Sequence, residues 1–190
     1  MKGIKIGYCL CGSFCTFAQS IAQMETLAHL GADITPILSA AAFETDTRFG
    51  KAADIRARIE AVCGKAILHT IVGVEPIGPT APFDIALIAP CTGNTLSKLA
   101  AGITDTSVTM AAKAHLRSGR PLCLALATND ALLGSSAALG KMLARKHIYF
   151  VPMRQDNPAD KPTSLVADFT KIPAALEAAL AGKQLQPLFQ

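Results

Sequence analysis

Residues 85–95 read Ile-Ala-Leu-Ile-Ala-Pro-Cys-Thr-Gly-Asn-Thr, an aliphatic run that ends in a loop of small and polar residues. A short aliphatic run that stops at a proline is typical of a buried strand. Gly93 allows a ligand to approach the backbone closely. Thr92, Asn94 and Thr95 place hydrogen-bonding groups at the start of the helix expected next, and an ordinary N-cap turn would explain only one of them. We therefore predict a strand, a ligand-binding loop and a helix in this stretch.

The same alternation of strand and helix patterns extends along the whole chain. Strands are expected at residues 4–11, 33–38, 66–72, 85–89, 122–126 and 148–151, and helices near 17–31, 55–63, 95–102, 106–117, 139–143 and 172–181. This order is the signature of a parallel sheet with crossover helices. We predict an α/β fold of the Rossmann-like kind, a three-layer sandwich around a doubly wound parallel sheet.

The length of 190 residues suits one domain, 1–190. The Pro/Gly-rich stretch 75–82 is expected to be a surface connection. The segment 152–163 is polar and interrupted by proline, which predicts a loop or flap. Residues 172–181 are expected to form the C-terminal helix, with Pro173 in its first turn.

Composition excludes several classes of protein. The chain is 51% hydrophobic, but no apolar run approaches the about 20 residues that cross a bilayer. The N-terminus lacks the apolar stretch and cleavage site of a signal peptide, so we expect a cytoplasmic protein. The net charge of +4 comes without a Lys/Arg cluster, which argues against nucleic acid as a partner.

Six cysteines indicate a reducing compartment, where free thiols act as small apolar side chains. Cys9, Cys11 and Cys15 lie close together, but no second Cys/His pair has the spacing of a zinc site. No bound metal is therefore expected.

The loop Gly12-Ser13-Phe14 follows the first expected strand and offers amides and a hydroxyl at a helix start, which suits a phosphate. A small-residue loop is also how any such fold makes its first turn. The spacing is neither G-x-G-x-x-G nor that of a P-loop, which lowers the rank of tightly held NAD and of nucleoside triphosphates.

The loop 90–95 resembles the P-A-S-A-N-T motif of the homo-oligomeric flavin-containing cysteine decarboxylases, and 102–105 resembles the G-I-A-D segment that follows it there. With the stretches 110–117, 127–131 and 148–152, the chain is similar over nearly its whole length to the dipicolinate synthase B-subunit family, which is related to those decarboxylases. The resemblance implies a flavoprotein fold of the decarboxylase type with FMN as cofactor.

Residue by residue, the resemblance assigns FMN contacts to Gly12, Ser13, Phe14, Ser39, Phe43, Thr92, Gly93, Asn94, Thr95, Ala127 and Thr128. The segment 127–129 stands where the relatives carry the P-A-M-N substrate clamp, with Thr128 in place of methionine and without the tryptophan that follows. Candidate catalytic residues are Asn129 and His69. The decarboxylases use a histidine on a helix, whereas His69 lies in a strand pattern, so a structural role for it is also open.

The implied activity is formation of pyridine-2,6-dicarboxylate during sporulation, from a hydroxylated tetrahydrodipicolinate precursor and together with the A subunit of dipicolinate synthase. NAD(P) would enter through that second protein. A dianionic substrate needs cations, and the candidates are Lys113 and Arg117, four residues apart on one expected helix, and Arg154 in the polar segment. His115 and Lys161 are further cations nearby in sequence.

The resemblance also implies a homo-oligomer built on trimers, located in the mother cell of a sporulating bacterium. Two alternatives stay open. One is a flavin-dependent decarboxylase or a prenyl-FMN-forming transferase of the same fold, and the other is a non-catalytic scaffold role.

Overall fold

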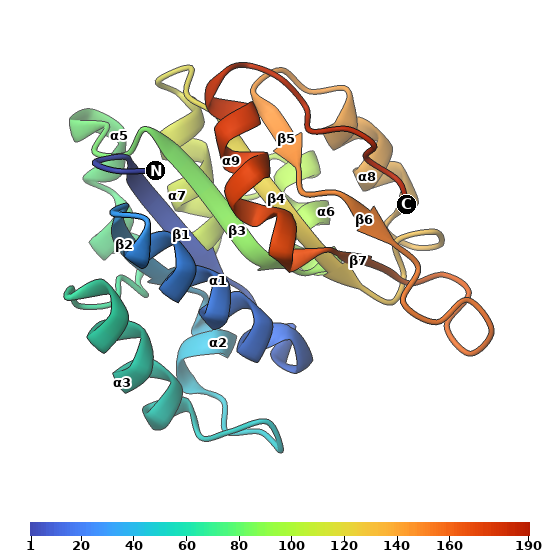
Figure 1. Cartoon of the computed structure of the whole chain (residues 1–190), viewed down its shortest axis with the longest axis horizontal. Coiled ribbons are helices and arrows are strands. Elements are labelled where there is room, and N and C mark those ends of the chain that lie inside the picture. Colours follow the sequence, from blue (N-terminus) through green and yellow to red (C-terminus); the bar gives the residue numbers. More distant parts are fainter.

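Five parallel strands in the order β2-β1-β3-β4-β5 form the main sheet of the computed structural model, which describes all 190 residues (Figure 1). A short antiparallel hairpin, β6 and β7, continues the sheet from the carboxyl end of β4. The strands are β1 (Lys5–Leu10), β2 (Asp33–Leu38), β3 (Ile85–Cys91), β4 (Leu122–Thr128), β5 (Ile148–Phe150), β6 (Met153–Arg154) and β7 (Leu165–Ala167).

Helices cover both faces of this sheet, and Figure 1 shows α1 and α9 in front of it with α6, α7 and α8 behind. The helices are α1 (Phe17–His29), α2 (Ala40–Glu44), α3 (Ala52–Cys63), α4 (Ile71–Val74), α5 (Ile77–Thr80), α6 (Gly93–Ala101), α7 (Ser107–Leu116), α8 (Ser136–Leu143) and α9 (Ile172–Leu180), with 3₁₀ turns η1 (Phe14–Thr16) and η2 (Phe169–Lys171). The predicted three-layer, Rossmann-like α/β fold is confirmed.

Strand alternation divides the core between the two faces. In β3, Leu87 packs with the α1 and α9 side, while its neighbour Ile88 packs with the α6 and α7 side. Because β3 is buried on both faces, all of its residues are apolar or small, as in parallel sheets generally.

A buried tyrosine fixes α1 on this sheet. The hydroxyl of Tyr8 donates to the carbonyl oxygen of Ser20 at 2.9 Å. The hydroxyl of Ser20 in turn donates to the carbonyl oxygen of Ala89 at 2.5 Å. Burial raises the pKa of the Tyr8 phenol, which therefore stays neutral. These bonds link β1, α1 and β3 directly beneath the end of the sheet where the first loops leave it.

Two expectations were wrong. Residues 66–72 do not form a strand: Leu68 makes a single bridge to β2, through the bonds Leu38 N to Leu68 O (2.9 Å) and Leu68 N to Pro36 O (3.0 Å), and Thr70 then caps α4. The stretch 75–82 is more than a connection, since it contains α5 and buries Ile77 against the core. The hairpin β6–β7 was not foreseen.

No helix of the protein is both long and apolar enough to span a bilayer.

Candidate functional site

A cleft of about 660 Å³ lies at the carboxyl ends of the parallel strands. The chain leaves β1 toward β2 on one side and returns to β3 on the other, so the loops after β1 and β3 diverge and leave a crevice between them. Ligands of open α/β sheets bind at such a point. The cleft is lined by Gly12, Ser13, Phe14, Cys15, Thr16, Arg48, Phe49, Thr92, Gly93, Asn94, Ala127, Thr128, Asn129, Asp130, Asp156, Lys161, Ser164 and Val166.

The amino terminus of α6 supplies hydrogen-bond donors to this cleft. The Thr92 side chain caps the helix by accepting from the Thr95 amide at 3.2 Å, whereas the amides of Gly93 and Asn94, in the first turn, have no acceptor within the chain. Free amides and the positive end of the helix dipole favour an anion at this place. The ligand-binding role predicted for this loop therefore has a physical basis.

Gly93 sits in a cradle that only glycine fits. A Cβ at this position would lie 2.6 Å from Asp130 Oδ1, 2.6 Å from Ser135 Oγ and 2.7 Å from Thr128 Oγ1. These three side chains bond to one another, since the hydroxyls of Thr128 and Ser135 donate to Asp130 Oδ1 at 2.5 and 2.9 Å. The loop after β4 thus rests directly on the start of α6.

The loop after β1 is tied to the same helix. Thr95 Oγ1 donates to Cys11 Sγ at 3.2 Å, across 84 positions of sequence. Burial raises the pKa of the Cys11 thiol to about 11, so it remains a neutral acceptor and packing group. Beyond it, the ring of Phe14 lines the cleft and packs on the buried ring of Phe17, with centroids 5.3 Å apart.

The third wall is the loop after β4, which is held by residues 155–164 between β6 and β7. We call these residues the hairpin loop. Thr163 Oγ1 donates to the Asn129 carbonyl oxygen at 2.6 Å, and Ser164 Oγ donates to that of Thr128 at 3.3 Å. Asn129 itself is exposed and faces the cleft. The segment predicted as a loop or flap therefore contacts the predicted catalytic residue.

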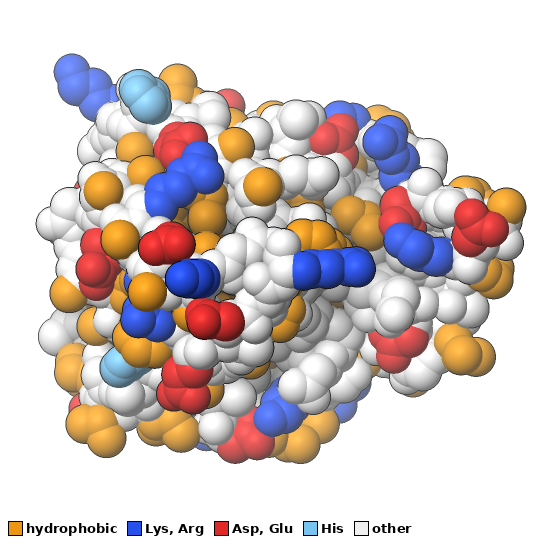
Figure 2. Space-filling model, turned by 90° about the horizontal axis from the view of Figure 1, so that it is seen from below, with side chains coloured by type: hydrophobic (Ala, Val, Ile, Leu, Met, Phe, Trp, Pro, Cys, Tyr) orange, Lys and Arg blue, Asp and Glu red, His pale blue; other side chains and the backbone are white.

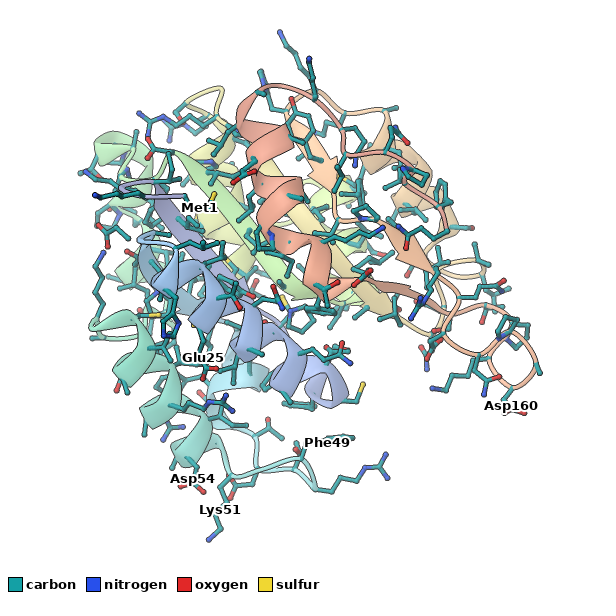
Figure 3. The ribbon with its side chains drawn as sticks, in the orientation of Figure 1. Met1, Glu25, Phe49, Lys51, Asp54 and Asp160 are labelled. Atoms are coloured by element: carbon teal, nitrogen blue, oxygen red, sulfur yellow. The ribbon has the colours of Figure 1, made fainter.

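Arg48 and Phe49 are among the lining residues that the sequence analysis missed. They belong to the loop 45–51 that follows α2, and Figure 3 shows Phe49 of this loop well apart from Asp160 in the hairpin loop. The only available signal was position, because a polar loop that follows a parallel strand by one short helix lies at the ligand-binding edge. Seen from that end, the surface carries Lys/Arg and Asp/Glu side chains intermixed, without a single large charged patch (Figure 2).

Several predicted residues lie outside the cleft lining. Ser39 caps α2 by accepting from the Ala42 amide at 3.3 Å, and Phe43 packs edge-on against His69 with ring centroids 3.7 Å apart. Thr95 lies behind the cleft, on Cys11. His69 is thus packed beside α2 and does not line the cleft, although its local structure is not the strand expected for it.

The three side chains predicted to bind the substrate as cations also lie outside the cleft lining. Lys113 and Arg117 line a separate hollow of about 290 Å³ together with Arg145, at the far end of α6. Arg154 lines a third hollow, beside α1, next to the hairpin loop. Of the cations considered from sequence, Lys161 lines the cleft.

His115 is structural. It is 1% exposed, and its Nε2 bonds to the Pro121 carbonyl oxygen at 2.9 Å while its Nδ1 has no partner. Burial lowers the pKa of this imidazole, which is therefore neutral near pH 7.

A sheet of order 2-1-3-4-5 with amides, hydroxyls and aromatic rings around its switch point is the architecture of a mononucleotide-binding α/β protein. The cleft volume lies within the about 300–1,000 Å³ of small-molecule sites, and the free amides fit the phosphate of a flavin mononucleotide. A family model described as Flavoprotein matches residues 1–175, and the chain belongs to that family.

Among individual relatives, the B subunit of dipicolinate synthase from Bacillus subtilis (strain 168) is 43% identical over 188 residues, covering 99% of this chain and 94% of that protein. The crystal structure of the dipicolinate synthase B subunit from Bacillus halodurans C superposes with a TM-score of 0.92 at 42% identity, over 100% of this chain and 97% of that one. The FMN-dependent cysteine decarboxylase SpaF has the same fold, with a TM-score of 0.69 at 20% identity over 94% and 95% of the two chains.

Proposed function

We propose that this chain is the FMN-binding B subunit of a dipicolinate synthase, which works with the A subunit to convert a hydroxylated tetrahydrodipicolinate into pyridine-2,6-dicarboxylate. The main support is geometric. Most of the residues that the resemblance assigned to FMN, from three loops far apart in the chain, line one cleft. The extensive identity to B subunits from two Bacillus species agrees with this proposal.

FMN would be held by the three walls of the cleft. The amides of Gly93 and Asn94 and the hydroxyls of Ser13 and Thr92 are the groups suited to its phosphate and ribityl chain. Phe14 supplies an apolar surface for the ring. Ser39, Phe43 and Thr95, which stand behind the lining, would act by holding α2 and the first turn of α6 in place.

When bound, FMN supplies an acceptor for the hydride that the substrate ring must lose to become aromatic. The overall change is loss of water from the hydroxylated ring, followed by loss of a hydride and a proton. The chain's own part is to orient the substrate and exclude water. Asn129, whose backbone is fixed by the hairpin loop, is placed to bond a substrate carboxylate or the flavin edge.

The decarboxylase alternative finds less support in the cleft. The relatives that decarboxylate cysteinyl substrates use a histidine, and the cleft lining contains none. Asp130 accepts bonds from two hydroxyls and serves the cradle around Gly93, rather than being free as a base.

Three further points extend the proposal by resemblance. The A subunit would use NAD(P) as the final electron acceptor, the B subunit would form homo-oligomers built on trimers, and the complex would act in the mother cell of a sporulating bacterium. Single-domain organisation over 1–190 is part of the same proposal.

The first test is the visible spectrum of the freshly purified chain, with mass spectrometry of whatever is released on denaturation. We expect FMN. Anaerobic mixing with the hydroxylated precursor, with and without the A subunit, should then bleach the flavin and yield pyridine-2,6-dicarboxylate. Asn129→Ala should retain the flavin but slow its bleaching. Lys51→Met, an exposed control outside the cleft lining, should bleach at the rate of the parent.

Other outcomes would redirect the assignment. A protein that cannot be loaded with FMN would overturn it. Flavin that never changes with precursor, even when the A subunit is present, would favour a scaffold role. Release of CO₂ from a cysteinyl peptide by the chain alone would favour a decarboxylase.

A further inference from the structure

We propose that Arg48, from the loop 45–51, and Lys161, from the hairpin loop, each bind one carboxylate of a dicarboxylate ligand in the cleft. They are the two Lys/Arg side chains among the residues that line the cleft. This inference rests on the proposed function and names the residues that recognise its substrate class.

Arg48 is presented by a well-defined loop. Thr47 and Gly50 exchange backbone bonds of 3.0 and 3.1 Å, and Asp46 accepts from the amide of Ala52 at 2.8 Å, which anchors the loop to the start of α3. The guanidinium of Arg48 lies 4.9 Å from the ring centroid of Phe49 and makes no ion pair with an acidic residue. Its donors are therefore free for a ligand.

Lys161 is presented from the other side by the hairpin loop. Its amide donates to the Asn157 carbonyl oxygen at 2.8 Å, and its ammonium lies 3.2 Å from Asp156 Oδ2. The nearby Ser164 hydroxyl, and after it the Lys161 ammonium, lower the pKa of the Asp156 carboxyl, so this group stays charged and positions the ammonium. The Lys161 side chain remains 55% exposed and accessible to a second anion.

The arrangement suits two anionic groups on one small molecule. Figure 3 shows the two arms reaching beyond the sheet on either side, marked by Phe49 and Asp160. The phosphate of FMN already has the free amides at the start of α6, so the two cations at the mouth are left for the substrate. A guanidinium binds a carboxylate through two parallel bonds, whereas an ammonium acts as a point charge.

The experiment uses the FMN-loaded full chain in buffer freed of divalent metals. Binding of pyridine-2,6-dicarboxylate and of pyridine-2-carboxylate is measured by titration calorimetry for the parent and for Arg48→Met, Lys161→Met and Lys51→Met. Lys51 is the matched control, since Figure 3 shows it in the same loop but pointing away from the hairpin loop. FMN and riboflavin affinities are measured alongside.

We expect Arg48→Met and Lys161→Met each to weaken the dicarboxylate by roughly tenfold or more, as the loss of a charge-assisted bond predicts. The parent should bind the monocarboxylate more weakly than the dicarboxylate, and each cleft variant should reduce this difference in affinity. Lys161→Arg, which keeps the positive charge, should bind the dicarboxylate more tightly than Lys161→Met does. This comparison separates the loss of charge from a disturbance of the hairpin loop. Lys51→Met should bind both ligands like the parent.

Unchanged dicarboxylate affinity in both cleft variants would overturn the inference, as would a parent that holds FMN but binds no dicarboxylate. A selective loss of FMN relative to riboflavin in Arg48→Met would also overturn it, because Arg48 would then serve the phosphate. In each of these cases the parent chain still binds FMN, so the proposed function stands. Failure of the parent to bind flavin would instead remove the proposed function on which the inference rests.

Discussion

Replacing Gly93 with alanine should damage the flavin site from inside. The added Cβ would meet three side-chain oxygens at 2.6 to 2.7 Å, closer than carbon and oxygen atoms can pack. Asp130 and its two hydroxyl partners must move, and overpacking of this kind costs about 2 kcal/mol. For a chain of this size that corresponds to a Tm lower by about 4–8 °C.

The matched control is Gly140→Ala. Gly140 lies in α8, exposed, with nothing within 4 Å of an added Cβ, so the change should stabilise the helix by about 0.5–1 kcal/mol. Calorimetric Tm and FMN titration are measured for both variants. Gly93→Ala should also bind FMN at least tenfold more weakly, because the loop that carries Asn129 is displaced. If the two variants have the same Tm and the same FMN affinity, the cradle has no such role and the reasoning fails.

Three further results are expected. Cys15 is exposed at the cleft and should be the first thiol to react with a disulfide reagent, and saturating FMN should slow that reaction; unchanged kinetics would place the flavin elsewhere. Burial lowers the pKa of His115, so the unfolded chain binds a proton at this imidazole more readily than the folded chain does. The free energy of unfolding, measured by urea titration, should therefore be highest above about pH 6.5 and decrease as the pH falls below that value. His115→Phe should flatten this part of the pH profile. Tyr8→Phe leaves the Ser20 carbonyl oxygen without its bond and should cost about 1 kcal/mol, measured as a lower urea midpoint with an unchanged m-value.

Strand and helix periodicity was enough to predict most of the parallel sheet and the helices that cover it. It failed where elements are short. The run 66–72 has strand composition, but its pairing ends after one residue because Thr70 caps a helix instead. The strands β6 and β7 have two and three residues, which is too short for an alternating hydrophobic pattern to be recognised in the sequence. Their pairing also depends on the edge of β4, with which β7 pairs.

The sequence predicted the loops after β1, β3 and β4 as parts of the candidate site, but it did not predict the part contributed by Arg48 and Phe49. Loops after strands carry local signals, such as Gly93 beside three polar residues. Arg48 carries none, since it reaches the cleft only through the folded position of the loop 45–51. Lys113 and Arg117 had the right charge and spacing, yet the direction of α7 takes them to the other end of α6.

The hairpin loop extends from the antiparallel part of the sheet, while the cradle around Gly93 is built on its parallel part. The tip of this loop, residues 156–161, forms its hydrogen bonds within the hairpin loop, and such a tip tolerates insertions and deletions. Related enzymes could therefore acquire new substrates by lengthening or recharging residues 156–161 alone, without altering the bonds from Thr163 and Ser164 to the loop after β4. Substrate choice and cofactor retention would then evolve as separable traits of one small protein.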